Sequence, residues 1–243
     1  MTKPVRLYTM RMVSSMQDLI AAIQAELETV GKTPSAGHVK TGDVRKISAR
    51  FFKDLRDKPK DYVFAVCEEL LKERTWPMKV IAFDFAYRLR KQYDQSTFTI
   101  FEGWLERYVR GWGDCDDFCT HAFGELICQY PALSEKTLLW TQREEFWMRR
   151  AAAVVLIPSI RRGKYEETRP LRVADLLMQD EHDLVRKGYG WMLKVLSEKE
   201  PELVFDYLMG HKDTMPRVAF RYALEKMGED RRRILMARLL TDH

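Results

Sequence analysis

The sequence has 243 residues, of which 46% are hydrophobic and 32% charged, a balance that is typical of a globular protein and excludes a disordered chain. Glycine (12) and proline (9) are sparse, which excludes a collagen-like chain and disfavours an all-β fold rich in tight turns. No apolar run reaches the ~18 residues of a membrane span, and the N-terminus lacks the apolar core of a signal peptide. Because the four cysteines form no regular framework, we expect a reducing compartment and a cytoplasmic protein without a membrane partner.

The net charge of +5 is mildly basic and unevenly distributed. Residues 32–60 carry nine basic and three acidic residues, and residues 143–172 carry eight basic and four acidic residues. The two stretches would form one surface for a polyanion if the fold brought them together, or two solvated helix faces if it did not. Charge alone favours the second interpretation.

Apolar residues recur at steps of three and four along almost the whole chain, which predicts helices throughout. The helices are expected, in chain order, over residues 16–30, 43–55, 61–70, 76–93, 97–109, 111–131 with an interruption near its start, 144–157, 171–178, 183–197, 201–209, 216–227 and 229–241. Ser14 or Ser15 is expected to cap the first of these helices and Asp43 the second. No segment alternates with the period of two that a strand requires, so the predicted fold class is all-α.

Four helical segments open with a similar rhythm of an acid or proline, a basic residue and then apolar residues. They read PMKVIAFDFAYRL, FWMRRAAAVVLI, LVRKGYGWMLKVL and MPRVAFRYALEKM, and they start near residues 77, 146, 184 and 215. The spacing is roughly 30–40 residues, except for a first step about twice as long, as if one copy there had diverged. A repeat of this length is typical of HEAT-like helix pairs. We therefore expect a HEAT-like solenoid with a concave basic surface, forming one domain over residues 1–243.

A cluster of three aspartates lies at a predicted loop–helix junction. Trp112 stands between two glycines, which allow an irregular backbone, and it is followed by aspartates at positions 114, 116 and 117. The structural role of an aspartate at a helix start is N-capping, which the positive end of the helix favours. One aspartate satisfies that role, so a carboxylate left over beside Trp112 is a candidate site residue.

Two adjacent arginines, Arg149 and Arg150, follow Trp147 in an alanine-rich helical segment. Adjacent helical residues point about 100° apart, so at least one arginine leaves the face that Trp147 and the alanines are expected to bury. An arginine placed in this way binds a phosphate bidentately, or it pairs at the surface with Glu144 or Glu145. The sequence leaves both alternatives open.

Two glycines, Gly188 and Gly190, interrupt an otherwise strongly helical segment at a cost of about 1 kcal/mol each relative to alanine. That cost indicates that a neighbouring helix or a ligand approaches closely, and helix packing is the commoner cause. Lys187, Trp191 and Lys194 follow one another at steps of four and three, so they share one helix face. An aromatic residue between two cations suits an anionic partner with a planar or cationic group better than it suits a core.

Metal binding is weighed from Cys115, Cys119, Cys128 and His121, whose spacing matches no standard zinc motif. The two cysteines that lie four residues apart share a helix face that excludes His121, so buried thiols are favoured over a structural zinc. The sequence contains no Gly-rich phosphate loop, no nucleophile elbow and no metalloprotease motif. We therefore expect neither a metal nor a cofactor.

The three segments taken together resemble the AlkD family, alkylpurine DNA glycosylases built from HEAT-like repeats. The Trp-x-x-x-Asp pattern of the family matches Trp112 and Asp116. Its aromatic-Leu/Met-x-Arg-Ala-Ala pattern matches residues 147–152 and places the functional arginine on Arg150. Its Lys-x-x-Gly-Trp-x-Leu-Arg/Lys pattern matches residues 187–194, and the closing PRVAFRYALEKM is similar to the last repeat of the family.

The N-terminal part departs from the family pattern. The likeness covers about residues 40–228, and residues 1–40 are expected to form a divergent helical segment of the same domain. The Gly-Val/Ile-x-x-Pro-x-x-Arg segment of the family aligns only loosely here, with Gly42 where proline is usual. Arg45 matches the arginine of that segment, and Thr41 joins it as an expected DNA contact.

The resemblance implies a monomeric, monofunctional DNA glycosylase of base excision repair. Its expected substrate is double-stranded DNA carrying cationic alkylated purines of the N7-methylguanine and N3-methyladenine type, whose N-glycosidic bond it would hydrolyse. The resemblance assigns the catalytic site to Asp116, Trp112 and Trp191. It assigns DNA contacts to Arg150, Lys187, Lys194, Arg45 and Thr41. The resemblance also implies that some relatives lack this aspartate and bind DNA without excising bases, so the presence of Asp116 favours the active class.

The chemistry of these residues fits such a substrate. Alkylation makes the purine cationic, so the base leaves as a neutral molecule and no general acid is needed. An ionised Asp116 would stabilise the positive charge that builds on the deoxyribose and orient a water. The rings of Trp112 and Trp191 would hold the cationic nucleotide by cation–π contact, at about 0.5–2 kcal/mol each. Two alternatives stay open: a non-catalytic HEAT-like protein that binds distorted or branched DNA, and a protein-interaction solenoid, which exposed non-basic apolar residues on the concave face would favour.

Overall fold

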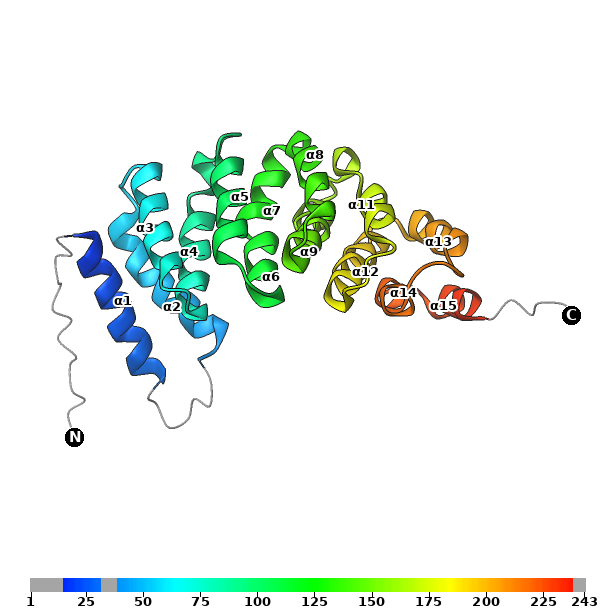
Figure 1. Cartoon of the computed structure of the whole chain (residues 1–243), viewed down its shortest axis with the longest axis horizontal. Helices are drawn as coiled ribbons and strands as arrows, with labels where there is room; N and C mark the ends of the chain where they lie inside the picture. Colours follow the sequence, from blue (N-terminus) through cyan, green and yellow to red (C-terminus); the bar gives the residue numbers. More distant parts are fainter. Residues whose placement is uncertain (1–14, 32–38, 238–243) are drawn as a thin grey trace, which may run out of the picture. The chain divides into compact units, whose positions relative to one another are not determined.

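The computed structural model describes residues 15–31 and 39–237, and every regular element in these two ranges is a helix (Figure 1). The chain divides into two compact units, residues 1–85 and residues 86–243. The all-α prediction is confirmed, whereas one domain over the whole chain stays a prediction. Within the described ranges, no helix combines the length and the apolar character that crossing a bilayer would need.

The first unit is built from amphipathic helices whose buried faces carry the predicted apolar residues. Its elements are α1 (Met16–Gly31), α2 (Thr41–Phe51), η1 (Phe52–Leu55), α3 (Lys60–Lys72) and α4 (Trp76–Arg88), which crosses the boundary. Ser15 Oγ accepts a hydrogen bond from Asp18 N at 3.2 Å, so the cap predicted for the first helix is confirmed at Ser15, while Ser14 lies outside the described residues. The prediction that Asp43 caps the second helix is wrong, because α2 begins at Thr41 and Asp43 pairs with Lys46 inside the first turn.

The second unit continues with short helices joined by short links. Its elements are η2 (Arg90–Gln92), α5 (Thr97–Tyr108), α6 (Trp112–Thr120), α7 (Ala122–Gln129), η3 (Pro131–Leu133), α8 (Ser134–Thr137), η4 (Leu138–Gln142), α9 (Phe146–Val154), α10 (Ile157–Arg161), η5 (Glu166–Thr168), α11 (Pro170–Leu177), α12 (Asp183–Ser197), α13 (Pro201–Gly210), α14 (Arg217–Leu224) and α15 (Glu229–Met236). The helix expected over 229–241 ends earlier within the described part, and residues 238–241 lie outside it.

Four helices of the second unit form a row in which each packs on the next. α6 contacts α9, α9 contacts α12, and α12 contacts α14, and Figure 1 shows them following one another along one side of this unit. The predicted repeats at 146, 184 and 215 fall on the last three of these helices. Trp112, the first residue of α6, lies 35 residues after Pro77 and 34 residues before Phe146. α6 therefore occupies the position at which the long first step indicated a diverged copy.

The single helix expected over residues 111–131 is two helices, α6 and α7, because the backbone breaks at His121 (φ −122°, ψ −95°). The break brings the Cys119 carbonyl oxygen and the Pro158 ring so close to Gly124 that no Cβ fits there. The core beneath the two helices is rich in aromatic rings in mutual contact, namely Phe98, Phe101, Trp104, Phe118, Phe123 and Trp140. Through these ring contacts α6 packs against α5.

Candidate active site

The start of α6 presents the first two candidate residues on one side of the helix. Gly111 is the N-cap in an extended conformation (φ −164°), and no side chain caps the helix. The expectation that one of the three aspartates acts as the cap is therefore wrong, since all three lie within the helix. Trp112 is 55% exposed, and Asp116, one turn later, is half-buried. The Trp-x-x-x-Asp spacing thus places an exposed ring and a carboxylate on the same helix face.

Asp116 is bound in a bidentate ion pair by Arg150 from the neighbouring helix α9. Asp116 Oδ1 accepts from Arg150 Nε, and Asp116 Oδ2 accepts from Arg150 Nη2, both at 2.7 Å. The Asp116 side chain remains 18% exposed, so solvent reaches the carboxylate despite the pair. A carboxylate oxygen accepts more than one hydrogen bond, so Asp116 keeps free acceptor capacity. The carboxylate is oriented by one arginine and open to a further partner.

Arg150 is itself enclosed by protein, with 5% of the residue exposed. Its Nη1 donates to the Leu184 carbonyl oxygen at the start of α12. Burial alone would lower the pKa of the guanidinium. The hydrogen bonds to Asp116 and its negative charge outweigh burial and raise the pKa above its usual value. Gly188 makes room for this side chain, because a Cβ there would stand 3.0 Å from Arg150 Cγ and 3.2 Å from Nη1. Arg150 therefore joins α6, α9 and α12 at Asp116.

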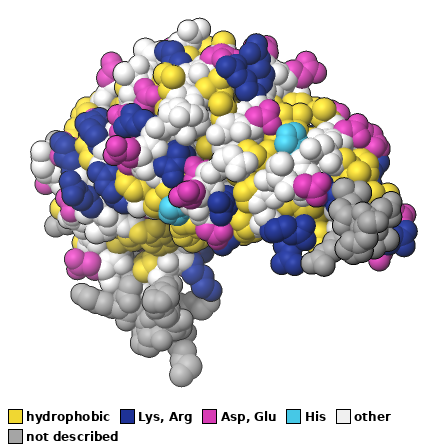
Figure 2. Space-filling view, turned by 45° about the vertical axis from the view of Figure 1, so that its right-hand side comes forward, with side chains coloured by type: hydrophobic (Ala, Val, Ile, Leu, Met, Phe, Trp, Pro, Cys, Tyr) yellow, Lys and Arg dark blue, Asp and Glu magenta, His cyan; other side chains and the backbone are white. Residues whose placement is uncertain are grey.

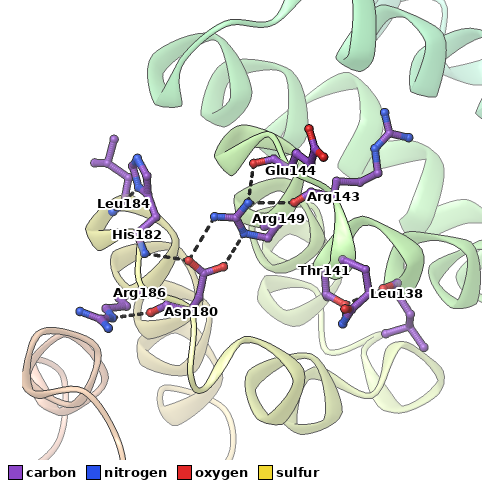
Figure 3. A network of polar contacts seen from close by, with 10 residues as sticks. Leu138, Thr141, Arg143, Glu144, Arg149, Asp180, His182, Leu184 and Arg186 are labelled. Carbon is purple, nitrogen blue, oxygen red and sulfur yellow. Dashed lines mark hydrogen bonds and ion pairs between the residues drawn. The ribbon is translucent and has the colours of Figure 1, made fainter.

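Arg149 points to a different carboxylate, Asp180, and its hydrogen bonds hold neighbouring loops in place (Figure 3). It forms an ion pair with Asp180, and its Nη1 donates to the carbonyl oxygens of Arg143 at 2.8 Å and Glu144 at 2.7 Å. Asp180 Oδ1 also accepts from His182 N at 2.8 Å. Of the two alternatives left open, surface pairing with the carboxylates of Glu144 or Glu145 is wrong for both arginines, because their carboxylate partners are Asp180 and Asp116.

The stripe predicted on α12 is present, with Trp191 half-buried between two lysines. Lys187 Nζ lies 2.8 Å from Asp183 Oδ2, and Lys194 Nζ lies 2.7 Å from Glu225 Oε1. Sequence reasoning missed both carboxylates. The i,i+4 spacing of Asp183 and Lys187 was a usable signal for the first pair, whereas the second joins two helices and had none.

Both glycines of α12 have close neighbours, as the energetic cost of glycine in a helix predicted, but the two neighbours differ. A Cβ on Gly190 would stand 2.8 Å from the Ala219 carbonyl oxygen and 2.8 Å from Tyr222 Cβ, so α14 packs directly on the helix there. Gly188 faces the Arg150 side chain instead. Tyr222, which sequence reasoning also missed, is 36% exposed beside the stripe.

The thiols lie beneath the site and not in it. Cys115, Cys119 and Cys128 are buried and free, as expected, and Cys115 Sγ donates to the Trp147 carbonyl oxygen at 3.4 Å. Burial raises the pKa of Cys119 well above its usual value. Among the residues that the structure describes, no group of three or more His, Cys, Asp or Glu side chains is placed to hold a metal ion.

The basic stretches are divided between the two units. Thr41 is exposed and Arg45 half-buried on α2 of the first unit, and their contact with DNA stays a prediction. The basic residues of 143–172 separate into groups, and two of these arginines, Arg169 and Arg172, pair with Glu135 on α8. The concave basic surface also stays a prediction.

Comparison with known proteins identifies the family of the chain. The model of the family described as DNA alkylation repair enzyme matches residues 21–227, which is most of the chain. The chain belongs to this family. The resemblance to AlkD-type proteins that the motifs indicated is therefore confirmed, and the match extends further towards the N-terminus than the motifs did. No match is found among curated proteins.

Solved structures of the same fold include bacterial relatives with low sequence identity. A predicted DNA alkylation repair enzyme from Enterococcus faecalis has a TM-score of 0.69 at 16% identity, covering 87% of this chain and 96% of its own. AlkD2 from Streptococcus mutans has a TM-score of 0.64 at 18% identity, covering 88% and 99%. The protein smu.31 from Streptococcus mutans UA159 has a TM-score of 0.63 at 17% identity, covering 88% and 100%. At these identities the likeness shows the fold, so the all-helical architecture is shared while the reaction is argued from the site.

Proposed function

We propose that the protein is a DNA glycosylase that hydrolyses the N-glycosidic bond of cationic alkylated purines in DNA. The observation that carries this proposal is Asp116, a partly exposed carboxylate held at 2.7 Å by Nε and Nη2 of the buried Arg150, one helical turn from the exposed ring of Trp112. Membership of a DNA alkylation repair enzyme family supports DNA as the substrate. The geometry supports a site that receives positive charge.

The proposed reaction needs no general acid. A purine alkylated at N7 or N3 is cationic and leaves as a neutral base, so the barrier lies in the positive charge that develops on the deoxyribose. Asp116 stabilises that charge electrostatically. Its remaining lone pairs accept a hydrogen bond from a water molecule, which orients the water for attack on the sugar. Trp112 and Trp191 bind the cationic nucleotide through their ring faces, at about 0.5–2 kcal/mol each.

Arg150 acts here as a positioning residue. Its guanidinium fixes the plane of the Asp116 carboxylate, and three of its N–H groups are already engaged by Asp116 and the Leu184 carbonyl oxygen. A contact between Arg150 and a DNA phosphate, which the family resemblance assigns, would have to use the donors that remain. Contact with DNA by Arg150 stays a prediction.

A second candidate, a DNA-binding protein without catalysis, is favoured by the same ion pair, because Arg150 offsets part of the negative charge of Asp116. The test is to incubate the protein with duplex DNA containing N7-methylguanine and to measure released base over time, with a duplex carrying hypoxanthine as the neutral-lesion control. Release above the spontaneous rate, restricted to the cationic lesion, is the expected result. Binding of both duplexes without release would favour the second candidate, and no binding of DNA would contradict both.

A further inference from the structure

Both lysines that flank Trp191 are held by carboxylates. Lys187 pairs with Asp183 one turn earlier on α12, and Lys194 pairs with Glu225, the residue that follows α14. The two lysines and the two carboxylates cancel in charge. On the face of the molecule that Figure 2 shows, Lys and Arg side chains are likewise interspersed among Asp and Glu side chains. The stripe assigned to DNA contact is therefore close to neutral in the protein without DNA.

These two pairs are easily opened. The side chains of Asp183 and Glu225 are 59% and 54% exposed, and those of Lys187 and Lys194 are 34% and 19% exposed. Because both carboxylates face water, solvent and salt weaken the two pairs, which contribute little to folding. Hydrogen bonds from Lys187 and Lys194 hold the pKa of each partner carboxyl below its usual value, so both are ionised at neutral pH. The two carboxylates therefore interact electrostatically with any charged group that approaches the lysines, and they contribute little to the stability of the fold.

Their effect differs between undamaged DNA and DNA with a cationic lesion. Phosphate contacts supply essentially all the affinity for undamaged DNA. A carboxylate within 3 Å of a lysine neutralises that lysine and repels an incoming phosphate, which lowers this affinity. A cationic base held against Trp191 is attracted by the same carboxylates, so part of the loss is offset when the lesion is present.

We propose that Asp183 and Glu225 are specificity-determining residues that weaken binding to undamaged DNA more than binding to DNA with a cationic purine. This inference rests on the proposed function, since it requires the α12 stripe to face DNA. It assigns a use to two carboxylates that take no part in the reaction itself. It also predicts that removing them strengthens binding, which a merely structural role would not do.

The test is the double variant Asp183→Asn/Glu225→Gln, with binding measured by fluorescence anisotropy on an undamaged duplex and on the same duplex carrying N7-methylguanine. We expect affinity for the undamaged duplex to rise about tenfold at low salt. We expect a smaller rise for the damaged duplex, so that the ratio of the two affinities falls. The dependence of binding on salt should steepen by up to about 0.9 in log–log slope for each lysine that newly neutralises a phosphate.

A matched control removes the same charge elsewhere in the second unit. Glu135 pairs with Arg169 and Arg172, and Asp230 pairs with Arg233, all of them exposed and on other elements. The variant Glu135→Gln/Asp230→Asn therefore changes net charge equally and frees cations away from α12. If this control tightened binding as much as the test variant, net charge alone would explain the effect and the proposal would be overturned. Unchanged affinity of the test variant would overturn it as well.

A double-mutant cycle assigns the effect to one pair. Asp183→Asn is expected to tighten binding of the undamaged duplex more in the wild type than in a Lys187→Ala background, because only in the wild type does it also release the lysine for a phosphate. Equal tightening in both backgrounds would contradict the proposed mechanism. Failure of the proposed function is distinguishable: a wild type that binds no DNA contradicts both proposals, whereas a wild type that releases N7-methylguanine and yields no tighter variant contradicts this inference alone.

Discussion

Two adjacent arginines on α9 form ion pairs of similar chemistry with different consequences. Arg149 binds Asp180, whose side chain is 6% exposed and also accepts from the His182 backbone N–H. Arg150 binds Asp116, whose side chain is 18% exposed and lies one turn from an exposed tryptophan. The first carboxylate is enclosed by the protein and holds two loops together, whereas the second is more exposed to solvent. Access from solvent, and not the presence of an ion pair, marks a candidate catalytic carboxylate.

The surroundings of the two pairs support the same distinction. Beside Asp180, the ring of His182 stacks on Phe146 with 4.1 Å between centroids, and His182 Nδ1 accepts from Leu184 N to cap α12. The polar atoms near Asp180 are therefore satisfied within the protein. Beside Asp116, the ring of Trp112 is open to solvent. The predictions below test whether this difference decides function.

The largest effect is expected from Asp116→Asn, which keeps the shape of the side chain and removes its charge. Single-turnover release of N7-methylguanine should fall about 10²- to 10³-fold, the usual loss when one preorganised electrostatic group is removed. Because Arg150 then becomes a buried cation without a counter-ion, the fold should also lose about 3–5 kcal/mol, so release is measured well below the melting range. Unchanged release by the folded variant would remove Asp116 from the catalytic role.

The matched change at the other pair, Asp180→Asn, should affect stability and spare the reaction. Its removal leaves Arg149, which is 20% exposed, without its carboxylate and should cost up to about 3 kcal/mol in a thermal or denaturant melt. Base release per folded molecule should stay close to the wild type. If the variant lost release as severely as Asp116→Asn at equal folded fraction, the comparison between the two pairs would fail.

An intermediate effect is expected from the two tryptophans, changed one at a time to alanine. Each should lower release of a cationic base about 2- to 30-fold, the range that corresponds to a cation–π contact, and should lower release of a neutral base less. Because Trp112 is 55% exposed, the free energy of unfolding of the Trp112→Ala variant should lie within about 0.5 kcal/mol of the wild type. Trp191 is half-buried, so Trp191→Ala should lower the free energy of unfolding by part of the ~3–5 kcal/mol that truncating a fully buried tryptophan costs. The full cost at Trp191 would place it in the core and contradict its role in binding.

The smallest effect is expected from Gly188→Ala. The new Cβ would press on the Arg150 side chain at 3.0–3.2 Å, which a flexible side chain can relieve by a small shift, so the melting temperature should change little. Release should fall severalfold, because the shift tilts the guanidinium that orients Asp116. Gly190→Ala is the control: it meets the backbone of α14 and should destabilise the fold without touching Arg150. A loss of release confined to Gly190→Ala would contradict the positioning role of Arg150.

Much of the local structure was readable from the sequence. The helix predicted over residues 183–197 is α12 with the same bounds, because its apolar period is strong. The close approach to Gly188 and Gly190 followed from the energetic cost of glycine in a helix. The spacing of Trp112 and Asp116 placed both on one face, since a helical period fixes which residues share a side.

What sequence reasoning could not supply was the pairing between helices. Arg150 and Asp116 lie 34 residues apart in the chain, and their contact depends on how α6 packs against α9. The break at His121 was missed as well, because nothing in its neighbours marks an end of the helix and the kink is set by packing around Gly124. For the same reason, local spacing offered only Glu144 and Glu145 as partners of the two arginines, whereas tertiary packing supplied Asp180 and Asp116.

The buried cysteines have a consequence for chemical durability. Methylating agents attack thiolates as well as purines, and the thiolate is the reactive form of cysteine. All four thiols of this chain are buried, and burial raises the pKa of Cys119 and Cys128, which keeps them protonated. Cys115 and Cys119 lie in the same helix as Asp116, where a bulky adduct would disturb the carboxylate. Burial and protonation of these thiols therefore slow their reaction with alkylating reagents and protect the packing of the helix that carries Asp116.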